Sequence, residues 1–310
     1  MKKVRVFAPA SIANMGCGFD VIGLALDDVG DIIEITESEG DGLTIINKSG
    51  VPMPEDIEMN VITPVVRSFL QRIGKKAKIE VTICEKIYPG SGIGSSAASS
   101  AAAAYGMNEL FGCPLSEEEV VLCAMEGERL ASGGYHADNA APAVMGGIVL
   151  IRGYEPLDII KLPVPGNFYC AVVHPHLVVN TKEAREILPK EVPMHDAVSQ
   201  WGNVGGLVAG LCTGNIGLIG RSMKDSIAEP YRKKFIPGFD ELRGNLHDVG
   251  VLAMNISGSG PSVFALCDKN EVAEKAGGMM RRHFEGRDIG CEVYVVKVSN
   301  KGCKLMGISI

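Results

Sequence analysis

A glycine-rich segment, Pro89-Gly-Ser-Gly-Ile-Gly-Ser-Ser-Ala-Ala-Ser99, carries the clearest chemical signal in this sequence. Three glycines lie in one short loop, and a run of small residues from Ser95 to Ala104 opens a helix behind it. Backbone N–H groups in such a loop are unobstructed by Cβ atoms and converge on the positive end of a helix dipole. The segment therefore predicts an anion-binding site whose ligand is a phosphate group.

Two other phosphate-binding loops fit this segment poorly. A Walker loop ends in Gly-Lys-Ser/Thr, but here Ser95 follows Gly94 and no lysine is near. A dinucleotide-binding fold needs a second strand soon after the helix, with an acid on it roughly 20 residues on. Here a second helix, with a capping box of Ser116 and Glu119, follows instead. A glycine turn with a packing helix that binds nothing remains an alternative.

The elements that must position the loop follow from hydrophobic periodicity. A strand at 79–87 precedes the loop, a helix from Ser95 to about Leu110 follows it, and a helix at 116–131 comes next. The proline-rich stretch from Gly153 to Gly166 is predicted to be a linker, and the mixture of strands and helices beyond it suggests a split βαβ sheet. Further strands are expected at 4–8, 31–36, 148–151, 169–174, 262–266 and 291–298, and further helices at 60–73, 196–211 and 271–284.

The composition is typical of a cytoplasmic enzyme. The chain has 310 residues, which is long for one core and sufficient for two domains, and 46% of them are hydrophobic. Nine cysteines without a CxxC pair indicate reduced thiols. The N-terminal segment is not expected to act as a signal peptide, and no stretch approaches the roughly 20 apolar residues of a membrane span. The formal charge of −7 argues against a nucleic-acid partner.

Five ordered motifs resemble the GHMP kinases (galacto-, homoserine, mevalonate and phosphomevalonate kinases). The loop from Pro89 to Ala98 resembles their central motif, allowing for the doubled alanine. Three others, at Ala8 to Asp20, His136 to Gly147 and His174 to Arg185, resemble the branch of the family that acts on homoserine. The segment from Asn255 to Leu266 resembles the C-terminal glycine motif of the family, a glycine loop that leads into a strand. Together they cover most of the chain, from residue 8 to 266.

The resemblance implies an α+β fold with two domains and the active site between them. Residues 1–155 are expected to form an ATP-binding domain like domain 2 of ribosomal protein S5, and residues 166–310 a ferredoxin-like domain. The implied activity is phosphorylation of the homoserine side-chain hydroxyl by ATP with Mg²⁺, a step of threonine biosynthesis. A homodimer is a family-level expectation. The alternatives are a kinase for another small alcohol and a ligand-binding relative without catalysis.

For ATP and the metal, the resemblance points to the glycine loop and two oxygen ligands. Ser96 and Glu128 are expected to hold Mg²⁺, which prefers hard oxygen ligands and keeps several waters. By composition alone Glu128 is a solvated helix acid, and Ser95 is an alternative to Ser96 unless it caps the helix. Asn60 is expected to contact the nucleotide base or to cap a helix. The loop residues assigned to ATP are Pro89, Gly90, Ser91, Gly92, Ile93, Gly94, Ser95, Ser96, Ala97, Ala98 and Ser99.

The acceptor side departs from mevalonate-kinase-like members, which place an aspartate seven residues before the Gly-Gly pair. Here that position is Asn139, and Asp138 lies beside it. An amide cannot act as a general base at neutral pH, so catalysis is expected to depend on positioning and charge stabilisation, with Asn139 orienting the hydroxyl. Asp138 as the base is the alternative.

A zwitterionic substrate needs a guanidinium for its carboxylate and a carboxylate for its ammonium. The resemblance supplies Arg185 and Arg232 for the first and Asp20 for the second, although both arginines could equally be ordinary surface cations. The remaining expected substrate contacts are Asn14, His136, Thr181 and Gly260.

Overall fold

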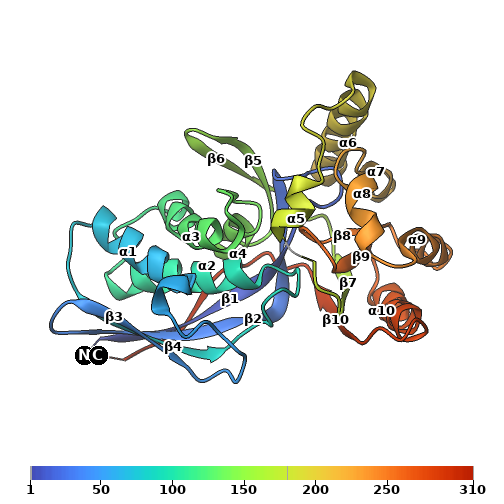
Figure 1. The fold of residues 1–310 in the computed structure, drawn as a ribbon. Helices are drawn as coiled ribbons and strands as arrows, with labels where there is room; N and C mark the ends of the chain where they lie inside the picture. Colours follow the sequence, from blue (N-terminus) through green and yellow to red (C-terminus); the bar gives the residue numbers. More distant parts are fainter. Residues whose placement is uncertain (1, 180, 310) are drawn as a thin grey trace.

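The computed structural model describes residues 2–179 and 181–309, and the side chains of Thr181 and Lys182 lie outside what it describes. The chain forms an α+β structure in which a glycine loop lies between two sheets (Figure 1). The strands are β1 (Lys3–Ala13), β2 (Ile22–Ser38), β3 (Gly42–Asn47), β4 (Lys78–Glu85), β5 (Ile148–Tyr154), β6 (Leu157–Leu162), β7 (Tyr169–Pro175), β8 (Ala253–Ile256), β9 (Val263–Cys267), β10 (Cys291–Lys297) and β11 (Lys304–Ser309).

The helices divide between the two halves of the chain. Those of the first half are η1 (Ile57–Met59), α1 (Ile62–Arg72), α2 (Ser95–Leu110), α3 (Glu117–Ser132) and α4 (Ala140–Met145). Those of the second half are α5 (Thr181–Glu186), α6 (Met194–Thr213), α7 (Ile216–Ser222), α8 (Glu229–Arg232), η2 (Lys233–Phe235), α9 (Phe239–His247) and α10 (Asn270–Glu285).

The larger sheet has the order β11-β1-β2-β4-β3, and the hairpin of β5 and β6 joins it through β2. Helices α1 to α4 cover one face (Figure 1). The alanine-rich α2 packs at the centre because its small side chains let the helix approach β1 and β2 closely. Helix α3 begins at the predicted capping box, in which the Ser116 hydroxyl accepts from the Glu119 amide and the Glu119 carboxylate accepts from the Ser116 amide.

The smaller sheet has the order β10-β7-β9-β8, and all of its pairs are antiparallel. Numbered along the chain this is 4-1-3-2, the split-βαβ arrangement that the sequence predicted. Helices α9 and α10 pack on one face of it, with buried residues such as Phe239 and Phe284. On the other face, residues of α6 and α7 share a core with the ends of β1 and β2.

Two sequence predictions need correction. The linker expected from Gly153 to Gly166 is wrong over much of its length, because β5 extends to Tyr154 and β6 pairs with it across a tight turn. The strand predicted at 291–298 is present as β10, but a further strand, β11, was not predicted; it follows β10 and pairs with β1 in the larger sheet. The domain boundaries at 155 and 166 remain a prediction.

Candidate functional site

A cavity of about 480 Å³ lies where the two halves meet, and residues of both halves line it. Fifteen of the residues proposed from the sequence lie on its wall, so the separate motifs converge in space. These are Asn14, Asp20, Asn60, Pro89, Gly90, Gly92, Gly94, Ser95, Ser96, Glu128, His136, Asn139, Arg185, Arg232 and Gly260.

Six of the residues proposed for the site are not among those that line the cavity. Ile93 is buried in the core shared by the two halves, Ser99 bonds to Asp31, and the Thr181 side chain lies outside the described part of the chain. The small Ala97 and Ala98 are buried in α2, and Ser91 is buried within the loop.

The glycine loop takes a conformation that side chains resist. Gly90, Gly92 and Gly94 have φ angles of 81°, 70° and 70°, in the left-handed region. Gly94 is the N-cap residue of α2, and a Cβ atom there would lie 2.1 Å from the Ser11 hydroxyl. The loop therefore brings bare backbone up to the start of α2, which is the geometry of an anion cradle.

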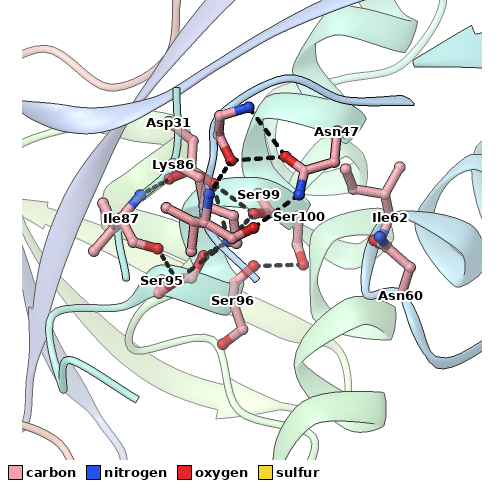
Figure 2. A network of polar contacts seen from close by, with 12 residues as sticks. Asp31, Asn47, Asn60, Ile62, Lys86, Ile87, Ser95, Ser96, Ser99 and Ser100 are labelled. Carbon is pink, nitrogen blue, oxygen red and sulfur yellow. Dashed lines mark hydrogen bonds and ion pairs between the residues drawn. The ribbon is translucent and has the colours of Figure 1, made fainter. Parts of the chain in front are cut away.

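The two serines after Gly94 have different roles. Ser95 does not cap α2; its hydroxyl donates to the Ile87 carbonyl at 2.8 Å, so the capping alternative is wrong (Figure 2). The Ser96 side chain points away from that contact and lines the cavity near Glu128.

Glu128 is not a solvated helix acid. Its side chain is buried, and its Oε1 has no hydrogen-bond partner among the described protein atoms. Burial raises the pKa of the Glu128 carboxyl to about 7, although Ser96 and the charge of Lys86 oppose the rise. An orphaned carboxylate oxygen beside a hydroxyl, both facing a cavity, fits a hard divalent cation such as Mg²⁺.

Among the described residues, no group of three or more His, Cys, Asp or Glu side chains could hold a metal ion. A Mg²⁺ ion held by Glu128 and Ser96 would therefore need other oxygens, and nucleotide phosphates supply them.

Asp138 and Asn139 meet the cavity at the start of α4. Asn139 accepts a hydrogen bond from the Ser11 hydroxyl at 2.9 Å through its Oδ1. The Asp138 carboxyl is buried, and its pKa is raised to about 7, first by burial and then by the charges of Asp20 and Glu128.

The charged groups expected to bind a zwitterion lie together. Arg185 forms a two-pronged ion pair with Asp20, with N–O distances of 3.0 and 2.7 Å. Arg232 is only 5% exposed, and donates to the carbonyls of Ala184 and Gly258. Both guanidinium groups lie over the Phe19 ring, at 5.3 and 5.0 Å from its centroid. Arg232 is therefore not the surface cation that its lysine-rich surroundings suggested.

Three further polar residues line the cavity. Asn14 accepts from the Asp20 amide and donates to the Gly258 carbonyl. His136 lies 3.8 Å from Asp20, and burial lowers the pKa of its imidazole. Asn60 also lines the cavity, and its side chain accepts from the Ile62 amide at the start of α1, although the N-cap residue of that helix is Val61.

Sequence reasoning missed Lys86. Its side chain is 6% exposed, and its ammonium lies within hydrogen-bond distance of Ser95 and Ser99, at the start of α2 (Figure 2). A lysine therefore does lie beside the glycine loop, contrary to the prediction from the sequence. The lysine of a Walker loop follows the glycines, whereas Lys86 precedes the loop in the chain. Its position shortly before Pro89 is the one sequence signal that could have identified it.

The chain is similar to known proteins over nearly its whole length. Family models described as the GHMP kinases N terminal domain and the GHMP kinases C terminal match residues 60–147 and 207–286. A homoserine kinase of Chlorobium phaeobacteroides is 42% identical, covering 99% of this chain and 100% of the relative. One from Pyrococcus abyssi is 36% identical over 98% and 99% of the two chains.

Solved structures give the same result. The crystal structure of homoserine kinase from Cytophaga hutchinsonii superposes with a TM-score of 0.93 at 47% identity, covering 98% of this chain and 97% of that one. The L. major mevalonate kinase in complex with R-mevalonate, at 17% identity and a TM-score of 0.71, shares the fold.

Proposed function

Because this chain belongs to the homoserine kinases of the GHMP kinase family, we propose that the cavity between its halves holds ATP and homoserine together. The family assignment makes the chain an ATP-dependent homoserine kinase. The observation that carries the site proposal is the meeting, in one cavity, of a glycine loop and a cluster of charges that suits a zwitterion.

The phosphates of ATP bind to the glycine loop and the start of α2. Backbone amides from Gly90 to Ser96 and the helix dipole supply the positive potential, so an acidic chain can bind a polyanion locally. Ser96 and Glu128 would hold Mg²⁺, which when bound neutralises charge on the transferred phosphoryl group. Asn60, at the edge of the cavity, is proposed to contact the base.

The amino acid binds at the charged cluster around Phe19. Its carboxylate binds the guanidinium groups of Arg185 and Arg232, and its ammonium binds the carboxylate of Asp20. In the structure Arg185 and Asp20 are paired with each other. When the substrate binds, this ion pair within the protein is replaced by ion pairs of the substrate carboxylate with the arginines and of the substrate ammonium with Asp20. Asn14, His136 and Gly260 complete the wall, and Thr181 is proposed to join them.

Phosphoryl transfer needs aligned reactants and stabilised charge more than covalent chemistry by the protein. Asn139, held by Ser11 beside Gly94 in the cavity wall, orients the hydroxyl. The proton then leaves to the γ-phosphate or water, with Asp138 as the competing acceptor. None of the helices formed by the described residues is long and apolar enough to cross a membrane. A cytoplasmic location and a homodimer are also proposed.

The test is ADP release with a panel of alcohols. We expect turnover with ATP and L-homoserine, loss of it on chelation of Mg²⁺, and O-phospho-L-homoserine as the product. Mevalonate, galactose and serine should be turned over far more slowly. Turnover of mevalonate or galactose without any of homoserine would overturn the proposal, and unchanged turnover in excess chelator would remove Mg²⁺ from it.

A further inference from the structure

A buried ion pair lies under the glycine loop. Asp31 of β2 is fully buried, and Lys86, which follows β4, is 6% exposed. The Lys86 ammonium lies 2.7 Å from the Ser99 hydroxyl, 3.2 Å from the Ser95 hydroxyl, 3.4 Å from the Ser95 carbonyl and 3.3 Å from Asp31 (Figure 2). The lysine therefore joins β2, the residues before the loop and the first turns of α2.

The same contacts tie the two ends of the loop together. Asp31 accepts from the Ile87 amide at 2.8 Å and from the Ser99 hydroxyl. The Ser95 hydroxyl donates to the Ile87 carbonyl, so Ile87 is held through both of its backbone polar groups. The chain enters and leaves the loop through one buried network, which fixes the path of residues 88–94 between them.

The stability of the fold does not by itself explain the buried network of Asp31 and Lys86. Burying two charges costs desolvation free energy, and apolar residues of similar volume are often as stabilising. A cation beside a helix N-terminus also opposes the helix dipole, which favours anions there. Both costs are offset when the neighbouring guest is an anion, and Lys86 lines the cavity together with Ser95, Ser96 and Glu128.

We propose that Lys86, anchored by Asp31, is a positioning residue for the ATP phosphates. It holds the glycine loop in its anion-binding form and adds a fixed positive charge at the start of α2. The inference rests on the proposed binding of the ATP phosphates at this loop. It adds a cation to a site whose other donors are backbone amides.

The experiment compares ligands with and without phosphates. In Lys86→Met, the Kd of ATP and ADP should rise on the order of 10- to 100-fold, the usual cost of removing a supporting contact behind a ligand site. Adenosine, measured as an inhibitor competitive with ATP, and homoserine should bind within about twofold of the unaltered chain. Lys86→Arg should recover most of the loss, because it restores the charge.

Lys161→Met is the matched control, since Lys161 donates to the Met145 carbonyl and is not among the residues that line the cavity. It should leave all affinities unchanged. Equal weakening of ATP and adenosine in Lys86→Met would reduce Lys86 to a structural role, and unchanged ATP affinity would remove it from the site. If the unaltered chain itself binds ATP no better than adenosine, the phosphate site fails rather than the role of Lys86.

A second variant keeps the proposal testable if Lys86→Met does not fold. Ser99→Ala removes the closest partner of the ammonium but leaves both charges in place. ATP affinity should fall severalfold with adenosine unchanged. An unaltered ratio of ATP to adenosine affinity in folded Ser99→Ala would contradict the anchoring of Lys86.

Discussion

At the scale of single residues, Asp138 and Asn139 pose the main mechanistic question. Asn139 is held by Ser11 and can orient a hydroxyl but cannot take its proton. Asp138 has a pKa raised to about 7, which is close to the value that suits a general base at neutral pH. The raised pKa is explained by burial beside Asp20 and Glu128, so it does not by itself require a catalytic role.

The pH dependence of the rate in variants of Asp138 and Asn139 distinguishes the two possible mechanisms. Without a protein base, Asn139→Ala should lower kcat about 100-fold through lost positioning, and Asp138→Asn should keep the rate within severalfold. A base at Asp138 would be protonated below pH 7, so the rate would fall as the pH falls. Replacing that base would cost about 10²- to 10⁴-fold and remove this acidic limb.

The measurement is kcat/KM from pH 5 to 9 at saturating Mg²⁺. Saturation matters because the Glu128 carboxyl has a pKa raised to about 7 as well, and its protonation would weaken metal binding over the same pH range. A large rate loss with a flat acidic limb in Asp138→Asn would overturn the mechanism without a protein base.

The arginines near Phe19 should act on homoserine alone. Arg185→Ala and Arg232→Ala should each raise the homoserine KM by about 30- to 150-fold, which corresponds to about 2–3 kcal/mol for a lost charge-assisted contact. The ATP KM should stay nearly constant, because the glycine loop is separate. Steady-state kinetics with each substrate varied gives both values.

Arg152→Ala serves as the control for these two variants. Arg152 pairs with Asp158 at the protein surface and does not line the cavity, so its loss should change neither KM. Thermal unfolding should accompany the kinetics, since Arg232 also bonds two backbone carbonyls. A variant that lost ATP affinity and kept homoserine affinity would show that its arginine was wrongly assigned.

At the scale of helices and strands, the sequence correctly predicted the elements that interactions between residues close in the chain determine. The loop, α2 and α3 were placed correctly because glycines, small residues and the Ser116 cap act over a few residues. The β5–β6 hairpin was missed because Gly153 and Pro156 have the composition of a linker, and the pairing of the two strands specifies β6.

The site shows the same limit. Motif resemblance brought the glycine loop and Arg232 into one site, but the burial of Arg232 depends on Ala184 and Gly258, far along the chain. Lys86 was missed for a similar reason, since its role comes from Asp31, 55 residues away. Distant partners of this kind leave no periodic signal in the sequence.

Gly94→Ala should disable the loop. The φ angle of 70° disfavours a side chain, and its Cβ would lie 2.1 Å from the Ser11 hydroxyl that holds Asn139. We expect kcat/KM for ATP to fall about 100-fold or more. Gly74→Ala is the matched control, because Gly74 has a φ angle of 64° but open space around its Cβ position. Equal activity losses in the two variants would mean that the contact with Ser11 is irrelevant.

At the scale of the whole molecule, the two halves meet at the glycine loop itself. Ser257 donates to the Gly92 carbonyl at 2.6 Å, and Ser262 donates to the Ser91 carbonyl. Asn14 donates across the same boundary to Gly258. The second half of the chain therefore holds the loop of the first half in place.

Ser257→Ala should loosen the loop without removing any group from the cavity wall. Stability should fall by about 1 kcal/mol, the ATP KM should rise severalfold, and amide exchange in residues 90–94 should quicken. Thr213→Ala, which removes a hydroxyl bonded within α6, should destabilise comparably at most and leave the ATP KM unchanged. Unaltered exchange in the loop of Ser257→Ala would show that the second half does not restrain it.

The pairing of β11 with β1 has a consequence for how the chain is made. Lys3 lies opposite Ser309, so β1 leaves the ribosome almost a full chain length before its neighbour exists. At 5–20 residues per second that interval is about 15–60 s. Throughout it one edge of β1 stays open to other strands, as unpaired edges do. A nascent chain of this enzyme thus exposes that edge of β1 until β11 has been translated.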